Sequence, residues 1–393
     1  MILDRFRFWI LILLVMISGL SQGMLMPLLA IILEQAGISS SMNGLHATGL
    51  YIGVLIASPF MEKPMQKYGF KPIILVGGIL VIISLALFPL WEALWFWFIL
   101  RVAIGIGDNM LHFGTQTWIT TTVDQKTRGR SISLYGMSFG LGFALGPLFT
   151  RLLEINQALP FILSALLSTL VWSLMLFVRN KWPNDESEVV TTTASNNSSI
   201  KRFILTTKIA WIALLPPLAY GFLEATLHAT FPIYGLRIGH DVNMLSLIIP
   251  CFAGGSLLSQ LPLGILSDKV GRRKILLVIM TLGLFCFIGA ALLEASVTAL
   301  FICFTLAGVF VGSLYSLGIS YMTDLLPTTL LPAGNLLCSI AFSIGSLGGP
   351  YVGGIFIEVL PEVSFFYMVA IVLALLVFAM VLKRDSVRNE VGV

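Results

Sequence analysis

The chain contains apolar runs that are long enough to cross a lipid bilayer. Residues 8–33 and 363–382 carry no charged side chain, and a transmembrane helix needs about 20 mostly apolar residues. Only 11% of all residues are charged, against about 25% in soluble domains. Because the runs are continuous rather than alternating, they also argue against a transmembrane β-barrel. The sequence therefore predicts an all-α membrane protein.

Charged, Pro-rich and Gly-rich breaks divide the sequence into twelve candidate transmembrane helices, in two groups of six. The expected spans are residues 8–34, 43–62, 72–90, 94–122, 130–153, 157–179, 208–236, 242–266, 274–294, 297–323, 330–357 and 363–383. Between the groups, residues 191–199 are rich in Thr, Ser and Asn, a composition typical of a flexible linker. The predicted organisation is an N-terminal six-helix bundle at 1–179, a cytoplasmic linker at 180–207, a C-terminal six-helix bundle at 208–383 and a cytoplasmic tail at 384–393.

The placement of basic residues predicts how the helices are oriented. Most of the 23 Lys and Arg residues lie in the segments that the twelve spans place on the same side of the membrane as both termini. Cytoplasmic loops carry the excess of such residues in membrane proteins, so we expect both termini in the cytoplasm. The basic residues stand singly between apolar runs and form no stripe, so the net charge of +4 does not indicate nucleic-acid binding.

Several landmarks recur in both halves at a nearly constant interval of about 200 residues, which indicates a duplicated six-helix unit. One pair is Lys71 and Arg273, and another is a Gly-xxx-Gly-Pro string. The string occurs as Gly142, Gly146 and Pro147, and again as Gly345, Gly349 and Pro350. Small residues at this spacing let helix backbones approach closely, and Pro removes a hydrogen bond where a helix bends. Plain tight packing explains this string as well as a functional role does.

The loop after the eighth span carries the most specific motif. It comprises Gly264, Asp268, Lys269, Gly271, Arg272 and Arg273. This pattern resembles the GxLxDKxGRRK loop signature of the major facilitator superfamily. The resemblance implies two six-helix bundles around a central cavity, with Asp268 and Arg272 in an ionic latch that closes the cytoplasmic side. The corresponding first-half loop has Gln66 in the acidic position, which implies a weaker latch there.

Two further motifs resemble elements of the same family. Arg101, Gly105 and Gly107 fit its RxxxGxG element, whose arginine is linked with proton coupling. The string that starts at Gly345 continues with two glycines, as in the family's drug/proton antiporter branch, whereas the first-half string continues with Thr150 and Arg151. The resemblance thus points to the antiporter-like branch, with a departure that leaves proton-linked uptake and uniport open.

Polar and ionisable residues lie inside the predicted fourth and seventh spans. One Arg, Lys or Asp near a helix centre costs about 2.5–3.5 kcal/mol, so each needs a partner, water or a function. Arg101, Asp108 and His112 share one helix stripe, and Asn109 adds a neutral group beside it. The seventh span offers Tyr220, Glu224 and His228. By the resemblance, these residues converge with Gln22 and Tyr315 around a midplane cavity.

Burial disfavours the charged form of a carboxylate, so a change in exposure would favour proton uptake or release. We therefore expect Glu224 to be the first candidate proton carrier and Asp108 the second. The alternative is a permanent structural ion pair between Arg101 and Asp108. The two residues are seven positions apart, so such a contact is possible but long.

From these residues and the resemblance we expect a secondary active transporter that exports a small, partly apolar molecule by proton-coupled alternating access. A membrane sensor that has lost transport is the alternative from another class. The sequence has neither an HExxH nor a Walker motif, so we expect no enzymatic activity. Its four Cys residues show no CxxC spacing, and we expect no metal and no cofactor besides the coupling proton. The expected partners are the lipid bilayer and the substrate, with a monomer in the plasma membrane of a bacterium.

Overall fold

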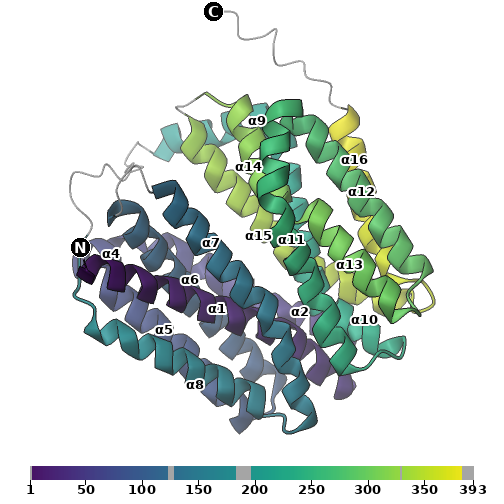
Figure 1. Ribbon diagram of the computed structural model, residues 1–393, viewed down its shortest axis with the longest axis horizontal. Coiled ribbons are helices and arrows are strands. Elements are labelled where there is room, and N and C mark those ends of the chain that lie inside the picture. The colour runs from purple at the N-terminus through teal and green to yellow at the C-terminus, as the bar shows by residue number, and fades with distance from the viewer. Residues whose placement is uncertain (1, 123–127, 183–195, 328–329, 383–393) are drawn as a thin grey trace, which may run out of the picture. The chain divides into compact units, whose positions relative to one another are not determined.

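The computed structural model describes residues 2–122, 128–182, 196–327 and 330–382. In this part of the chain, every regular element is an α-helix or a short 3₁₀ helix, which confirms the all-α prediction. Within these residues, eleven helical segments are long and apolar enough to cross a membrane. The contacts divide the chain into two compact units, whose helices are labelled in Figure 1.

The first unit comprises Met1–Ile38, Leu45–Val189 and Leu245–Pro250. The described residues up to 182 form eight α-helices and four 3₁₀ helices, of which α2 begins in the second unit. They are α1 (Ile2–Gln35), α2 (Ser40–Ala47), α3 (Gly49–Ala57), η1 (Ser58–Phe60), α4 (Glu62–Tyr68), α5 (Phe70–Leu87), η2 (Phe88–Leu90), α6 (Leu94–Thr122), α7 (Arg128–Leu145), η3 (Gly146–Glu154), α8 (Leu159–Leu174) and η4 (Met175–Phe177). Helix α1 packs against α7, α8 and η3, while α6 packs against α3 and α5.

The second unit comprises Ser39–Gly44, Val190–Met244 and Cys251–Val393. From residue 196 onward the chain forms α9 (Asn196–Ala229), α10 (Phe231–Arg237), α11 (Val242–Val270), α12 (Arg272–Leu292), α13 (Val297–Val311), α14 (Leu314–Leu325), α15 (Leu331–Val359) and α16 (Phe365–Leu382). Helix α9 packs against α14 and α15, and α12 packs against α13 and α16.

The predicted span at 43–62 is not one long helix, which is why eleven rather than twelve helical segments qualify. It falls on α2, α3, η1 and the start of α4. Thr48 separates α2 from α3, and both its amide and its hydroxyl donate to the carbonyl of Leu45, at 3.1 and 2.6 Å. These bonds to the third preceding residue tighten the turn and divide the span.

The middle of the predicted linker, residues 183–195, and the whole predicted tail lie outside the described residues. Helix α9 begins at Asn196, inside the range expected for the linker. The predicted domain boundaries and the cytoplasmic location of both termini stay predictions.

Close backbone contact joins α1 to α7 in the first unit. A Cβ atom added at Gly142 would lie 1.9 Å from the carbonyl oxygen of Met16, and one at Gly146 would lie 2.3 Å from the amide nitrogen of Met24. Only glycine allows such an approach, because any side chain would overlap the facing backbone. The first Gly-xxx-Gly-Pro string is therefore a packing surface for α1.

The second string plays the same part between α15 and α9. A Cβ atom at Gly345 would lie 2.2 Å from the carbonyl oxygen of Leu218, and one at Gly349 would lie 2.3 Å from the Thr226 hydroxyl. The two prolines differ in their effect. At Pro147 the α-helix gives way to the 3₁₀ helix η3, whereas Pro350 lies inside the continuous helix α15.

A second contact that recurs in both halves caps the C-terminal end of the sixth predicted helix. The Lys71 ammonium donates to the carbonyl oxygens of Leu176 and Val178, at 2.9 and 2.7 Å. The Arg273 guanidinium donates to the carbonyl oxygen of Met380 at 2.8 Å. Both cations thus satisfy carbonyls at a helix C-terminus, which also carries the negative end of the helix dipole.

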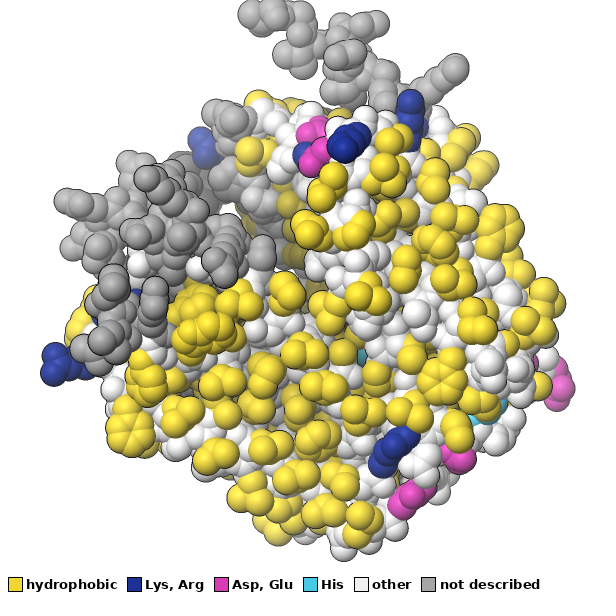
Figure 2. Space-filling model, viewed as in Figure 1, with side chains coloured by type: hydrophobic (Ala, Val, Ile, Leu, Met, Phe, Trp, Pro, Cys, Tyr) yellow, Lys and Arg dark blue, Asp and Glu magenta, His cyan; other side chains and the backbone are white. Residues whose placement is uncertain are grey.

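Much of the surface is apolar. Figure 2 shows hydrophobic side chains over most of the visible face, and charged side chains mainly near its edges. Large side chains such as Leu258 and Leu261 are 75% and 74% exposed. A surface of this kind suits lipid rather than water, in keeping with a multi-pass membrane protein.

Replacing Gly142 with Ala tests the backbone contact between α1 and α7. The added methyl group overlaps the Met16 carbonyl, so we expect thermal unfolding in detergent to show a loss of about 1–3 kcal/mol. Gly136→Ala on the same helix is the control, because an added Cβ there meets no atom within 4 Å. An unfolding temperature equal to that of the wild type for Gly142→Ala would contradict this packing role.

Candidate functional site

Helix α6 brings the side chains of Asp108 and His112 to α1. The Ser18 hydroxyl on α1 donates to Oδ1 of Asp108 at 2.7 Å and lies 3.0 Å from Nε2 of His112. Gln22, one turn further along α1, places its Nε2 3.4 Å from the Ser18 oxygen. Asp108 is 1% exposed. The structure thus brings together three of the residues predicted for the first half.

The hydrogen bonds of this cluster run in one direction. Ser18 uses its only proton toward Asp108, so Nε2 of His112 is the donor to Ser18. Nδ1 of His112 then accepts from the Tyr135 hydroxyl, 2.6 Å away. The chain of donors from Tyr135 through His112 and Ser18 therefore ends at Oδ1 of Asp108.

Arg101 and Asn109 point away from this cluster. The Arg101 guanidinium is 2% exposed and donates to the carbonyl oxygen of Leu25 at 3.3 Å. Seven residues of α-helix separate Arg101 and Asp108 by about 10 Å along the axis, and no ion pair joins them in the described part of the chain. Asn109 donates to the Ser58 hydroxyl at 3.1 Å. The structure therefore lacks the alternative ion pair.

The second unit holds its own cluster on α9. The Tyr220 hydroxyl donates to Oε1 of Glu224 at 3.1 Å, and Nδ1 of His228 lies 2.8 Å from the Glu224 carbonyl oxygen. Tyr315 on α14 joins through aromatic contacts, with its ring centroid 6.5 Å from that of Tyr220 and 5.3 Å from that of Phe342. All four residues predicted for the second half therefore lie in one polar and aromatic cluster.

Ser18, Tyr135 and Phe342 belong to these clusters but were not among the predicted residues. Ser18 lies one turn before Gln22 on α1, a spacing that places both on one helix face. Serine is nevertheless common at helix contacts in membranes, so the spacing alone does not single it out. Tyr135 and Phe342 reach the clusters from other helices, and no local pattern reveals them.

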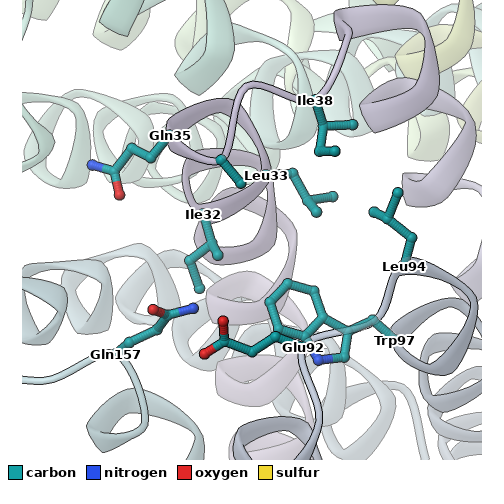
Figure 3. A pocket seen from close by; sticks show the side chains of 9 residues that line it. Ile32, Leu33, Gln35, Ile38, Glu92, Leu94, Trp97 and Gln157 are labelled. Carbon is teal, nitrogen blue, oxygen red and sulfur yellow. The ribbon is translucent and has the colours of Figure 1, made fainter.

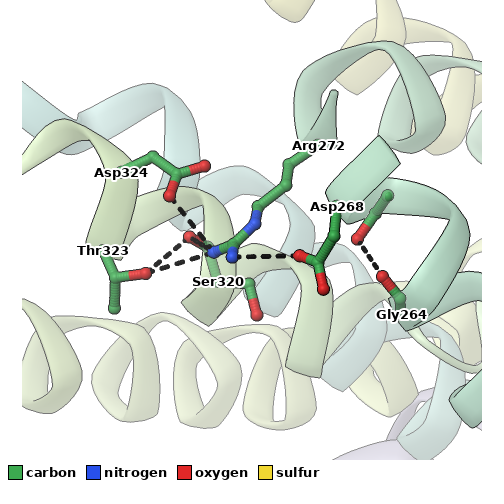
Figure 4. Close-up of polar contacts among 7 residues, drawn as sticks. Gly264, Asp268, Arg272, Ser320, Thr323 and Asp324 are labelled. Carbon is green, nitrogen blue, oxygen red and sulfur yellow. Dashed lines mark hydrogen bonds and ion pairs between the residues drawn. The ribbon is translucent and has the colours of Figure 1, made fainter. Parts of the chain in front are cut away.

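The loop signature forms a compact ionic cluster around Arg272 (Figure 4). Its guanidinium lies 3.2 Å from Asp268 and 3.3 Å from Asp324, and it also donates to the carbonyl of Ser320 and the hydroxyl of Thr323. Asp268 lies in the last turn of α11, and Asp324 lies in the last turn of α14. Arg272 thus ties the loop to α14 within the second unit.

The glycines and lysine of the signature have simpler surroundings. Gly271 adopts φ +106° between α11 and α12, a conformation that side chains disfavour. Gly264 accepts a hydrogen bond from the Ser267 hydroxyl at 2.7 Å, and Lys269 is exposed. The sharp turn explains the glycine before the two arginines.

A cavity of about 310 Å³ lies at the end of α1 (Figure 3). Ile32, Leu33 and Trp97 form part of its apolar wall, and Glu92 and Gln157 add polar groups. The residues predicted for the proton and substrate pathway do not line it. Its position therefore gives no support to that pathway.

Gly136, Ser138 and Gly140 have the GxSxG spacing of some hydrolases. In those enzymes the serine stands on a sharp turn between a strand and a helix. Here Ser138 lies inside α7, and its hydroxyl donates to the carbonyl of Leu134 at 2.8 Å. Ser138 therefore does not have the geometry of a hydrolase nucleophile.

Comparison with known proteins gives a consistent picture. A family model of the Major Facilitator Superfamily matches residues 11–249 and 218–392. The chain is 50% identical to the MFS-type transporter YfkF of Bacillus subtilis (strain 168), over 98% of this chain and 97% of the relative. It is 21% identical to the MFS-type transporter YcaD of Salmonella enteritidis, over 95% and 94% of the two chains.

Two solved structures share the fold. The nucleoside transporter NupG matches with a TM-score of 0.77 at 13% identity, over 97% of this chain and 99% of that chain. A bacterial homolog of the human lysosomal transporter Spinster, in an inward-facing and unoccupied conformation, matches with a TM-score of 0.72 at 16% identity, over 95% and 93%. At these identities the likeness concerns the fold.

Replacing Ser18 with Ala tests the first cluster. The change removes the donor to Oδ1 of Asp108 and leaves a buried carboxylate oxygen unsatisfied, so we expect a loss of about 1–3 kcal/mol in thermal unfolding. Ser138→Ala is the matched control, because that hydroxyl bonds only within its own helix. If both variants lose the same free energy of unfolding, the hydrogen bond from Ser18 to Asp108 contributes no more than a bond within one helix.

Proposed function

Because the chain belongs to the Major Facilitator Superfamily, we propose that it is a secondary transporter that exports a small, partly apolar molecule by proton-coupled alternating access. Two bundles rock around a central site in such transporters. We further propose that it acts as a monomer in the plasma membrane of a bacterium, with the proton as coupling ion and no other cofactor.

The Tyr220–Glu224 contact on α9 carries the proposal. A carboxyl group inside a membrane-spanning helix is costly unless it pairs, meets water or serves a function. The side-chain partner of Glu224 is the uncharged Tyr220 hydroxyl at 3.1 Å, and in the described residues no ion pair involves Glu224. A proton is therefore a suitable neutralising partner, and Glu224 is the first candidate proton carrier.

The aromatic rings beside Glu224 support a partly apolar substrate. Tyr220 and Phe342 stack with ring centroids 6.1 Å apart, and Tyr315 approaches both rings. Aromatic faces bind apolar or cationic groups, and tyrosine combines such a face with a polar hydroxyl. This combination favours a small amphipathic molecule over a strongly hydrated one.

The proton gradient supplies enough energy for this task. One proton moving down 100 mV releases about 2.3 kcal/mol, and one pH unit adds about 1.4 kcal/mol. Together they sustain a gradient of roughly several-hundred-fold for a neutral substrate. Proton-linked uptake or uniport is the second candidate, because Thr150 and Arg151 replace the two glycines of the antiporter string in the first half.

Replacing Glu224 with Gln tests proton coupling. A thermal-shift screen of drugs, sugars, amino acids, peptides and lipids first supplies a substrate, since a ligand at 100 times its Kd adds about 2.7 kcal/mol of stability. In proteoliposomes, we expect Glu224→Gln to abolish proton-driven transport and to leave counterflow exchange largely intact, because exchange needs no net proton movement.

Tyr220→Phe is the matched control, since it removes the hydrogen bond to Glu224 but keeps the carboxyl group. It should retain proton-driven transport. If Glu224→Gln instead loses substrate binding, then Glu224 is a substrate ligand. A substrate whose binding ignores pH in the wild type would favour uniport.

Replacing Asp268 with Asn tests the latch that the family resemblance implies. Asp268 is 65% exposed at its side chain, and Arg272 keeps its contact with Asp324, so the stability should change by less than about 1 kcal/mol. We expect slower turnover in a transport assay with little change in substrate affinity. An unchanged turnover rate would contradict the latch role of Asp268. The variant Asp324→Asn measures separately what the contact between Arg272 and Asp324 contributes.

A further inference from the structure

The cavity at the end of α1 has no part in the transport site proposed above. Its volume is about 310 Å³, and it lies within the first unit. The end of α1, the segment from η2 into the first turn of α6, and the segment before α8 surround it. Sites for small molecules in proteins have volumes of about 300–1,000 Å³. The cavity is therefore large enough for a small organic ligand.

The inner part of the cavity is an apolar floor formed by Ile32, Leu33 and Trp97. These side chains are 7%, 3% and 4% exposed. The indole N–H of Trp97 donates to the carbonyl oxygen of Phe88 at 3.1 Å, so its ring offers carbon surface to the cavity rather than a hydrogen-bond donor. The apolar floor can therefore take up the hydrocarbon part of a ligand.

The rim of the cavity is polar and accessible. Gln35, Glu92 and Gln157 line the cavity and are exposed, so a ligand can enter from the surface. Figure 3 shows the Glu92 carboxyl group and the Gln157 amide at the same side of the cavity. Among the described residues of the lining, Glu92 alone carries a charge. The rim thus presents a carboxylate together with amide oxygens that accept hydrogen bonds.

The charges near the rim also favour a cation. Glu34 at the end of α1 and Glu154 at the end of η3 add two carboxylates at this end of the first unit. The Nε of Arg151 donates to the Ser246 hydroxyl at 2.8 Å. Arg101 lies one turn beyond Trp97 on α6, where it is buried and donates to a backbone carbonyl. The charge around the opening is therefore mainly negative and attracts positive ligands.

We propose that this cavity binds a small organic ammonium compound, with the charged nitrogen at Glu92 and the hydrocarbon part on the apolar floor. An organic anion is repelled by Glu92, and a metal ion gains nothing from the apolar floor. The site lies in the first unit, whereas Glu224 lies in the second. The inference goes beyond the proposed transport function and does not depend on it, because binding is measurable without transport.

Three probes with the same phenylethyl body and different charge test the site. They are phenylethylammonium, phenylethanol and phenylacetate, which are positive, neutral and negative near neutral pH. Thermal unfolding of the purified full chain is followed in a neutral detergent at constant ionic strength. We expect phenylethylammonium to raise the unfolding temperature in a saturable manner, at a concentration roughly fivefold lower than phenylethanol requires. Phenylacetate should give no such rise. Equal effects of all three probes would overturn the proposal.

Replacing Glu92 with Gln removes the charge but keeps the size of the side chain. We expect the half-saturating concentration of phenylethylammonium to rise about fivefold, and that of phenylethanol to stay the same. Glu154→Gln is the matched control, because Glu154 is exposed at the same end but does not line the cavity. Glu224→Gln should also keep the wild-type response. If Glu224→Gln alone abolishes it, the probe binds in the second unit and the proposal is wrong.

Ala36→Trp tests the cavity without changing any charge. Ala36 lines the cavity and is exposed, so the larger side chain obstructs the opening without entering the core. We expect weaker binding of both phenylethylammonium and phenylethanol. Equilibrium dialysis with radiolabelled phenylethylammonium should give about one saturable site per wild-type chain, and less binding to Ala36→Trp. Unchanged binding in both Ala36→Trp and Glu92→Gln would overturn the proposal.

Discussion

Close contact between helix backbones at glycine is the constraint on which the two units depend. Lipid tails are as apolar as the helices they surround, so helices in a membrane associate through packing and hydrogen bonds rather than through the hydrophobic effect. At Gly142 and Gly345 the facing carbonyl oxygen occupies the place of a side chain. The same contact recurs between α1 and α7 and between α9 and α15, and it fixes the helices that carry the polar clusters.

The polar clusters follow from this packing. Helix α1 presents Ser18 to Asp108 and His112 on α6, and Tyr135 reaches the same group from α7. In the second unit, α9 carries Tyr220 and Glu224, while α14 and α15 supply Tyr315 and Phe342. The first cluster joins Asp108 to serine, histidine and tyrosine side chains, and the second is surrounded by aromatic rings. Glu224, whose side-chain partner is the uncharged Tyr220 hydroxyl, is the group to which we assign proton carriage.

Sequence periodicity predicted the helices well because continuous apolar runs leave the backbone little choice in a membrane. It failed at Thr48, where hydrogen bonds to Leu45 divide the span predicted at 43–62. The helical stripe correctly grouped Asp108 with His112, which are four residues apart. It also placed Arg101 on that stripe, yet the arginine turns to the Leu25 carbonyl. The spacing of residues within one helix predicts which side chains share a face. It does not predict which other helix packs against that face, because that depends on residues elsewhere in the chain.

Arg272 is the meeting point of several bonds, and this has a consequence for how the loop between α11 and α12 behaves. Asp268, Asp324, Ser320 and Thr323 all share one guanidinium. A rotation of that side chain breaks these bonds together, and a return restores them together. Because Ser320, Thr323 and Asp324 all lie on α14, a single side chain holds the start of α12 to that helix, and loss of the guanidinium would remove all of these bonds at once.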